Sequence, residues 1–266
     1  VKKERVRGKV LAVTDNSIEL EGYGCVPLDD NFHVYKAYGD FQVLGKGSIL
    51  VGYDLQEFVA ADGKLCAALL ERPFDARTIR VLLMDTGFKN LFHKKAELEL
   101  NCDARLVCKN DDGDSKESTL KKGEVLTLTA EDERLKHGRM TIIPEKEEGI
   151  TICSLERAQG QPVYSGSLEI KKEEEGLVLI NELYLEDYVK KVVPSEMPAS
   201  YEKEALKTQA VCARTYAYRQ IQGNTYGAYG AHVDDSTSFQ VYNNTQTNER
   251  TDQAVDETYG QLLTFD

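Results

Sequence analysis

The sequence lacks long hydrophobic runs. Among its 266 residues the longest apolar stretches are short segments such as residues 65–70 and 81–84, whereas a helix that crosses a bilayer needs about 20 predominantly apolar residues. We therefore expect no transmembrane helix. The chain starts at Val1, without a methionine and without the pattern of a signal peptide. We expect it to be the interior of a longer product, with an export signal or membrane anchor upstream.

Positive charge is also scarce. The 33 Lys and Arg residues are outnumbered by 45 Asp and Glu residues, which gives a formal net charge of −12. This balance argues against a protein that neutralises nucleic acid phosphates or an anionic membrane, and a neutral, cationic or mixed partner fits better. A hydrophobic fraction of 41% is ordinary for a globular protein, so we expect one large domain or two modest ones.

Cysteine pairs with metal-binding or redox spacing are missing. None of the six cysteines forms a C-x-x-C pair, which excludes a zinc ribbon and a thioredoxin-type motif. The nearest pair, Cys102 and Cys108, would lie about 20 Å apart on one continuous strand, so only an intervening turn could join them. We expect buried free thiols, although the sequence does not determine the disulfide state.

The first seventy residues alternate apolar and polar positions, as at Val6, Val10, Ile18 and Leu20. Turn signals interrupt this pattern at residues 15–16, 29–31, 45–47 and 61–63. Such alternation between turns predicts a small β-rich accessory domain over residues 1–73. Pro73 ends strand pairing in a short linker, and a second domain is expected over residues 76–266.

The second domain begins with strands and ends with helices. Strands are expected at residues 79–84, 96–100, 106–109, 125–129, 140–143, 150–154, 166–170 and 177–180. From Glu182 onward apolar residues recur at helical spacing. The two predicted stripes comprise Leu185, Tyr188, Val189 and Val192, and Leu206, Ala210, Ala213, Ala217 and Ile221. The fold class is therefore α+β: a small N-terminal all-β unit followed by a mixed domain with strands and a buried helix pair.

One carboxylate lies between two prolines. Glu196 is flanked by Pro194 and Pro198, and its apolar neighbours are Val193 and Met197. A rigid turn in a partly dry setting would raise the pKa of this glutamate, as a general acid requires. Alternatively, Glu196 begins a helix, whose dipole would lower its pKa. The polar flank of the second helix, Gln209, Arg214 and Tyr218, would line an adjacent cleft or form a structural hydrogen-bond network.

Three segments together resemble the SpoIID/LytB family. They are INELYLEDY at residues 180–188, VVPSEMP at 192–198 and EALKTQAVCARTYA at 204–217, supported by DSTSFQVY at 235–242 and TYG at 258–260. The resemblance implies peptidoglycan chemistry in the cell envelope. SpoIID proteins are lytic transglycosylases that act on glycan strands stripped of stem peptides during sporulation engulfment, and the LytB branch is described as an enhancer of an N-acetylmuramoyl-alanine amidase.

The resemblance places the catalytic glutamate of the P-S-E-M motif at Glu196. In a lytic transglycosylase the C6 hydroxyl of the substrate attacks C1, so one carboxyl group serves as acid and then as base, whereas a hydrolase usually needs a second carboxylate. The residues expected to orient the sugar or Glu196, with structural packing as the alternative, are Ser195, Gln209, Arg214, Gln240 and Tyr242.

Two departures from the family pattern matter. Some members carry a Cys/His zinc site where this chain has Asp234, Ser238 and Phe239, which argues against zinc, and no cofactor is expected. His232 near Asp234 and Asp235 would be a metal ligand, a second acid or a solvated surface histidine. The chain also stops at Asp266, before the end of a typical family domain, so we expect part of the cleft to be missing.

Two functions follow from this resemblance. The first is a lytic transglycosylase that cleaves MurNAc–GlcNAc strands with Glu196 and leaves 1,6-anhydro ends. The second is a non-catalytic amidase enhancer or glycan-binding scaffold. Both imply an extracytoplasmic location, peptidoglycan glycan strands as the partner, and other cell-wall hydrolases as further candidate partners. The N-terminal β unit is compatible with either function as a module that binds glycan or protein.

Overall fold

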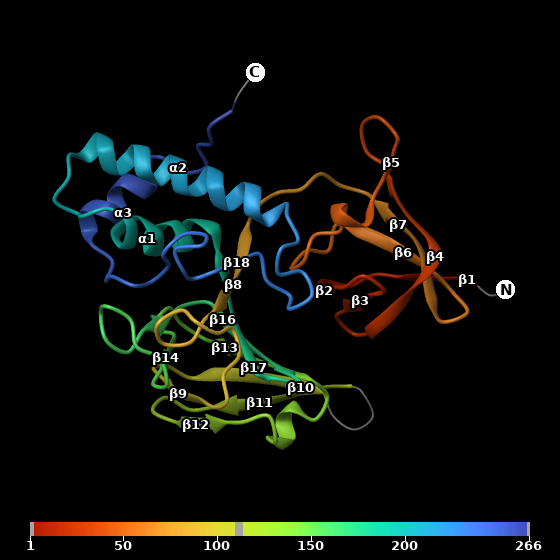
Figure 1. Ribbon diagram of the computed structural model, residues 1–266, viewed down its shortest axis with the longest axis horizontal. Helices are drawn as coiled ribbons and strands as arrows, with labels where there is room; N and C mark the ends of the chain where they lie inside the picture. Colours follow the sequence, from red (N-terminus) through yellow and green to blue (C-terminus); the bar gives the residue numbers. More distant parts are fainter. Residues whose placement is uncertain (1–2, 110–113, 265–266) are drawn as a thin grey trace. The chain divides into compact units, whose positions relative to one another are not determined.

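A computed structural model describes residues 3–109 and 114–264. The chain divides into two compact units (Figure 1). Unit 1 comprises Val1–Arg77 and Arg219–His232, and unit 2 comprises Thr78–Tyr218 and Val233–Asp266. Most of the regular structure is sheet, and the described residues contain three α-helices, so the α+β class is confirmed. None of these helices is both long enough and apolar enough to cross a membrane.

Unit 1 contains one sheet with the strand order β1-β6-β7-β4-β3-β2, and β5 pairs with β4. Its strands are β1 (Lys3–Val6), β2 (Val10–Val13), β3 (Ser17–Leu20), β4 (Gly24–Lys36), β5 (Gln42–Leu44), β6 (Gln56–Ala61) and β7 (Lys64–Leu70). Asp62 and Gly63 form the turn between β6 and β7, with φ values of 51° and 76°. An Asp-Gly pair with positive φ is typical of a tight hairpin, and it lies at the predicted turn.

The turn predicted at residues 29–31 is wrong, because these residues lie inside β4. Asp29 accepts a hydrogen bond from the backbone N–H of Asn31, which is the local turn chemistry that the sequence indicates. The strand nevertheless continues, and its pairing with β7 shifts register between Leu28 and His33. The polar segment therefore produces an irregularity within the strand instead of an end.

Residues 219–232 return to pack within unit 1. The backbone N–H of Val13 donates to the carbonyl oxygen of Gly227 at 2.8 Å, and the side chain of Asn224 donates to the carbonyl oxygens of Gly47 and Ile49. His232 is 1% exposed and its Nε2 lies 2.9 Å from the carbonyl oxygen of Val51, so the solvated histidine expected there is wrong. The sequence showed no sign of this return, and the predicted limits 1–73 and 76–266 stay a prediction.

Unit 2 is built on two sheets. The larger sheet has the order β11-β10-β13-β16-β17-β8-β18, and the smaller has the order β12-β9-β14-β15. Their strands are β8 (Thr78–Leu83), β9 (Ala96–Leu100), β10 (Ala104–Lys109), β11 (Ser115–Leu120), β12 (Val125–Leu128), β13 (Arg139–Pro144), β14 (Ile150–Ile152), β15 (Val163–Tyr164), β16 (Ser167–Glu173), β17 (Gly176–Tyr184) and β18 (Val233–Asp234). The adjacent strands β17 and β8 contribute fully buried residues such as Val81, Leu82 and Leu179.

Three helices complete the chain: α1 (Leu185–Glu196), α2 (Lys203–Ile221) and α3 (Glu249–Asp256). Both predicted apolar stripes are confirmed as buried. The predicted start at Glu182 is wrong, since Glu182 still belongs to β17, where it pairs with Arg80 of β8 both in register and through its side chain. The helix begins directly after the strand, which fixes the direction of α1 relative to the larger sheet.

The cysteines differ from the expected buried thiols. All six are free, but only Cys102 is buried, and Cys25 and Cys212 are exposed. Cys102 precedes β10 and Cys108 lies within it. The prediction of buried thiols is therefore wrong for most of them.

Candidate functional site

Glu196 is the last residue of α1. Pro194 lies inside the final turn of the helix, and Met197 ends it with an N–H donated to the carbonyl oxygen of Val193 at 2.9 Å. A proline so close to the end removes one helical hydrogen bond without breaking the helix earlier. Neither arrangement expected from the sequence is therefore correct: Glu196 lies neither on a turn between two prolines nor at the start of a helix.

The Glu196 side chain is exposed, so the expected dry setting is also wrong. Its position is fixed by a backbone contact, because the N–H of Val241 donates to Oε1 at 2.6 Å. Hydrogen bonds to a carboxylate are short and strong when the acceptor is charged. The group is thus held at the surface by the chain itself.

Ser195 attaches a second chain segment to the same helix end. Its Oγ donates to the carbonyl oxygen of Lys191 at 2.8 Å and accepts from the backbone N–H groups of Asn244 and Thr245 at 3.1 and 3.2 Å. The N–H of Asn243 also donates to the Lys191 carbonyl oxygen at 3.3 Å. Backbone groups at the end of a helix need such partners. Residues 240–245, which we call the docking loop, therefore satisfy the end of α1 and place Val241 beside Glu196.

Gln240 and Tyr242 belong to the docking loop, and both residues are buried. Tyr242 is 0% exposed, stacks on Tyr188 with 5.1 Å between ring centroids, and donates its hydroxyl to Asn181 Oδ1 at 2.6 Å. The Tyr188 hydroxyl donates to Gln240 Oε1 at 3.2 Å. Burial raises the pKa of both tyrosines, so they remain protonated donors. These buried contacts hold the docking loop in place on both sides of Val241. Sugar binding by Gln240 or Tyr242 stays a prediction.

Arg214 is engaged elsewhere. Its guanidinium forms a bidentate pair with Glu186, with both nitrogen–oxygen distances at 2.7 Å, and it also donates to the carbonyl oxygens of Val255 and Gln261. It thereby joins α2 to α1 and to the segment that contains α3. Gln209 is half-buried on α2, and no hydrogen bond within the described part of the chain joins it to Glu196. The structure brings Ser195, Gln240 and Tyr242 to the glutamate, but not Arg214.

A buried ion pair that the sequence did not indicate anchors the chain before the docking loop. Asp235 is 0% exposed and lies 2.6 Å from Arg157 Nη2, while the Met84 N–H donates to its other oxygen at 2.9 Å. Burial raises the pKa of Asp235 to about 6, against the opposing effects of Arg157 and the Met84 N–H. Asp235 is enclosed, and among the described residues no group of three His, Cys, Asp or Glu side chains could hold a metal ion.

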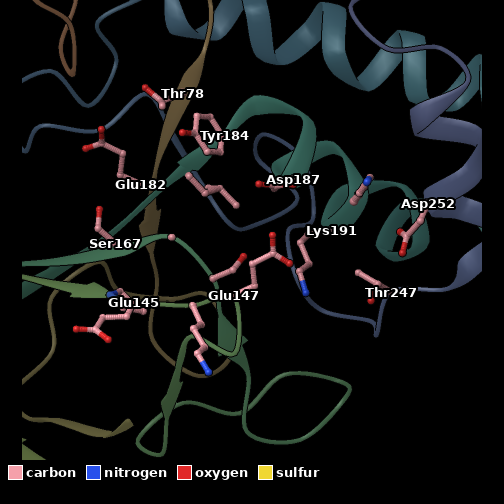
Figure 2. Close-up of a pocket in the computed structure, with 16 residues that line it drawn as sticks. Thr78, Glu145, Glu147, Ser167, Glu182, Tyr184, Asp187, Lys191, Thr247 and Asp252 are labelled. Atoms are coloured by element: carbon pink, nitrogen blue, oxygen red, sulfur yellow. The ribbon is translucent and has the colours of Figure 1, made fainter. Parts of the chain in front are cut away.

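A polar cleft of about 630 Å³ runs along the exposed side of α1. Figure 2 shows Asp187 and Lys191 of α1 and Asp252 of α3 facing this opening, with Glu147 on a loop across it and Tyr184 at its edge. Glu196 does not line it. No local pattern in the sequence indicates this cleft, because its walls come from segments that are far apart in the chain.

Comparison with known proteins finds the same family as the sequence motifs. Residues 173–265 match the family model of the Stage II sporulation protein, SpoIID. An uncharacterised protein of Brachyspira hyodysenteriae is 38% identical over 125 residues, 47% of this chain and 32% of that protein. The amidase enhancer of Bacillus subtilis is 43% identical over 77 residues, 29% of this chain and 10% of that protein.

Stage II sporulation protein D of Bacillus subtilis is 39% identical over 101 residues, 32% of this chain and 29% of that protein. The chain therefore aligns with between 10% and 32% of the length of these three relatives. The predicted resemblance to the SpoIID/LytB family is confirmed, and the matched segment contains α1, α2, α3 and the docking loop.

Proposed function

We propose that this protein, whose residues 173–265 match the SpoIID family, is a lytic transglycosylase that cleaves peptide-stripped glycan strands of peptidoglycan outside the cytoplasmic membrane. It would serve cell-wall remodelling or sporulation engulfment. The observation that carries the proposal is the geometry of Glu196: an exposed carboxylate at the end of a helix, fixed through Oε1 by the N–H of Val241 at 2.6 Å.

This arrangement suits a single acid and base. As the bond between C1 and the leaving oxygen breaks, the Glu196 carboxyl group donates its proton to that oxygen. The resulting carboxylate then takes the proton of the C6 hydroxyl as that oxygen bonds to C1 and closes the 1,6-anhydro ring. The Val241 N–H holds Oε1 and orients the group, so we assign both proton transfers to the second oxygen.

A second candidate is amidase enhancement without cleavage. A specific observation favours it, because one relative that is 43% identical to this chain is named amidase enhancer. In this function the helix end and the docking loop would bind glycan or a hydrolase, and the Glu196 carboxyl group would not need to transfer a proton.

Digestion of purified peptide-free glycan strands separates the two candidates. We expect the wild-type protein to produce 1,6-anhydro ends, read by mass spectrometry, and Glu196→Gln to produce none. Glu204→Gln, at an exposed glutamate on α2, is the matched control and should keep full activity. Reducing ends in place of anhydro ends would overturn the proposed reaction.

A folded wild-type chain that cleaves nothing would also overturn the reaction. If the same chain raised the rate of an N-acetylmuramoyl-alanine amidase on intact peptidoglycan, the result would establish the enhancer function instead.

A further inference from the structure

The cleft along α1 has the size and the lining of a ligand site. Its volume of about 630 Å³ falls within the usual range for sites that hold small molecules. Its residues come from α1, α3, the end of β17 and the loop after β13, all within unit 2. Because Glu196 is not among them, a ligand here would be held by groups other than the proposed catalytic carboxylate.

Part of the charge in the cleft is neutralised by the protein. Lys190 lies 2.7 Å from Asp256, and Glu182 is paired with Arg80. Asp187, Lys191 and Asp252 have no ion pair or hydrogen bond from their side chains within the described ranges 3–109 and 114–264. The same holds for Glu145, Lys146 and Glu147 of the loop after β13, so acids and lysines of both segments remain for a ligand, as the lining drawn in Figure 2 illustrates.

Asp252 is half-buried, and one of its two oxygens is enclosed by the protein itself. Its Oδ1 is buried and has no hydrogen-bond partner among the described residues. A buried carboxylate oxygen without a donor is costly, and native proteins rarely leave one. Asp187 and Lys191 are one turn apart on the same face of α1, so they meet the same ligand. Burial raises the pKa of both aspartates and lowers the pKa of Lys191, and the attraction between Lys191 and the two aspartates offsets only part of each shift.

We propose that this cleft binds a short zwitterionic peptide, with the ammonium group of the peptide placed at Asp252 and Asp187 and a carboxylate placed at Lys191. A cleft that presents acids and lysines together suits a ligand that carries a cation as well as an anion. A neutral sugar carries neither, whereas the peptide attached to muramic acid in peptidoglycan carries a glutamate carboxylate and the free amino group of a diamino acid.

The identification of this peptide as a wall stem rests on the proposed function, but the cleft does not depend on Glu196. A strand that is only partly stripped would be held through a remaining stem peptide in the cleft while Glu196 acts on a stripped stretch. The cleft would thus favour glycan strands on which a stripped stretch lies next to a remaining stem peptide.

Calorimetric titration with the tripeptide L-Ala-γ-D-Glu-L-Lys, its L-Ala amine blocked as an amide so that the lysine side chain carries the single ammonium group, tests the proposal. We expect binding to the wild-type protein, at least 10-fold weaker binding to Asp252→Asn and to Lys191→Met, and equally weak binding of the same tripeptide with an acetylated lysine side chain. Lys116→Met, at an exposed lysine on β11, is the matched control and should bind as the wild type does. Thermal unfolding of each variant verifies that it is folded.

Equal binding of the two tripeptides, with and without the acetyl group on the lysine side chain, would show that the lysine ammonium group is not recognised and would overturn the proposal. A peptide-free MurNAc–GlcNAc disaccharide that competes with the tripeptide, or binds in its place, would also overturn it, as would the absence of tripeptide binding. Glu196→Gln should bind the tripeptide normally, so peptide binding and glycan cleavage can fail independently.

Discussion

Glu186 and Asp187 are neighbours in the first turn of α1, yet they belong to two different regions. Glu186 accepts two hydrogen bonds from Arg214 at 2.7 Å and a third from the Gly260 N–H at 3.3 Å. Asp187 faces the cleft without a side-chain partner among the described residues, and burial raises its pKa. One helix therefore carries a satisfied carboxylate and an unsatisfied one side by side.

The same division recurs near the other end of α1. The polar atoms of Ser195 and Oε1 of Glu196 are bound by backbone groups of the docking loop. Lys191 takes part in both regions: its carbonyl oxygen accepts from Ser195 Oγ and Asn243 N, while its ammonium group lies in the cleft. The framework side of α1 is thus defined by Glu186, Ser195 and Glu196, and the cleft side by Asp187 and Lys191.

This difference separates stability from binding on a single element. Groups on the framework side already have protein partners, so their removal leaves buried donors or acceptors unpaired. Groups on the cleft side gain partners only when a ligand arrives, so their removal should cost the fold little. The comparison would be contradicted by a framework-side variant that loses little stability or by a cleft-side variant that loses much.

Arg214→Met should have the largest effect. The Arg214 side chain is 1% exposed, and its loss leaves the Glu186 carboxylate without its counter-charge. Removing one partner of a buried pair costs about 3–5 kcal/mol, and we expect a loss of that size in the free energy of unfolding measured with urea. Adding Glu186→Leu should recover part of it, because the double variant has no stranded charge. A loss below about 1 kcal/mol in the single variant would contradict the framework role.

The framework side also shows how much of the structure could be predicted from the sequence. The apolar stripes of α1 and α2 were predictable because helical periodicity is a local property of the chain. The family motif identified Glu196, and the P-S-E-M stretch placed Ser195 next to it. The end of α1 was not predictable, since Pro194 and Pro198 both indicate a break and only the docking loop shows which one ends the helix.

Contacts between distant segments account for what the sequence missed. Arg157 and Asp235 are 78 positions apart, and Arg214 and Glu186 are 28 positions apart, so neither pair leaves a local pattern. The predicted role of Arg214 in a polar network was one of two open alternatives, and its contacts with Glu186 fit that alternative. The cleft was missed for the same reason, because its charged residues share a surface only after α3 packs against α1.

Ser195→Ala should have an intermediate effect. It removes one donor to Lys191 and the acceptor of the Asn244 and Thr245 N–H groups. Unpaired groups of this kind cost about 1–3 kcal/mol of unfolding free energy. The docking loop should also loosen, so the rate of glycan cleavage should fall while the tripeptide still binds. Thr208→Ala is the control, because the Thr208 hydroxyl donates only to the Glu204 carbonyl oxygen on an exposed part of α2. Equal losses in both variants would contradict a special role for the loop.

Asp187→Asn and Asp252→Asn should have the smallest effect on stability, within about 1 kcal/mol, because both side chains are only half-buried. Burial raises the pKa of each aspartate in the folded protein, so the folded state binds more protons than the unfolded state in the range just above the ordinary pKa of about 4. Wild-type stability therefore falls as the pH rises through that range, and each Asn variant should lack its share of this fall. Urea unfolding from pH 4 to pH 7 should show the stability of each variant rising relative to that of the wild type as the pH rises.

Glu186→Gln is the matched control one position away, and it should lose about 1–3 kcal/mol of unfolding free energy at pH 7 because a charge-assisted pair with Arg214 is lost. If Asp187→Asn were as destabilising at pH 7 as Glu186→Gln, the two sides of α1 would not differ in the way that the contacts indicate.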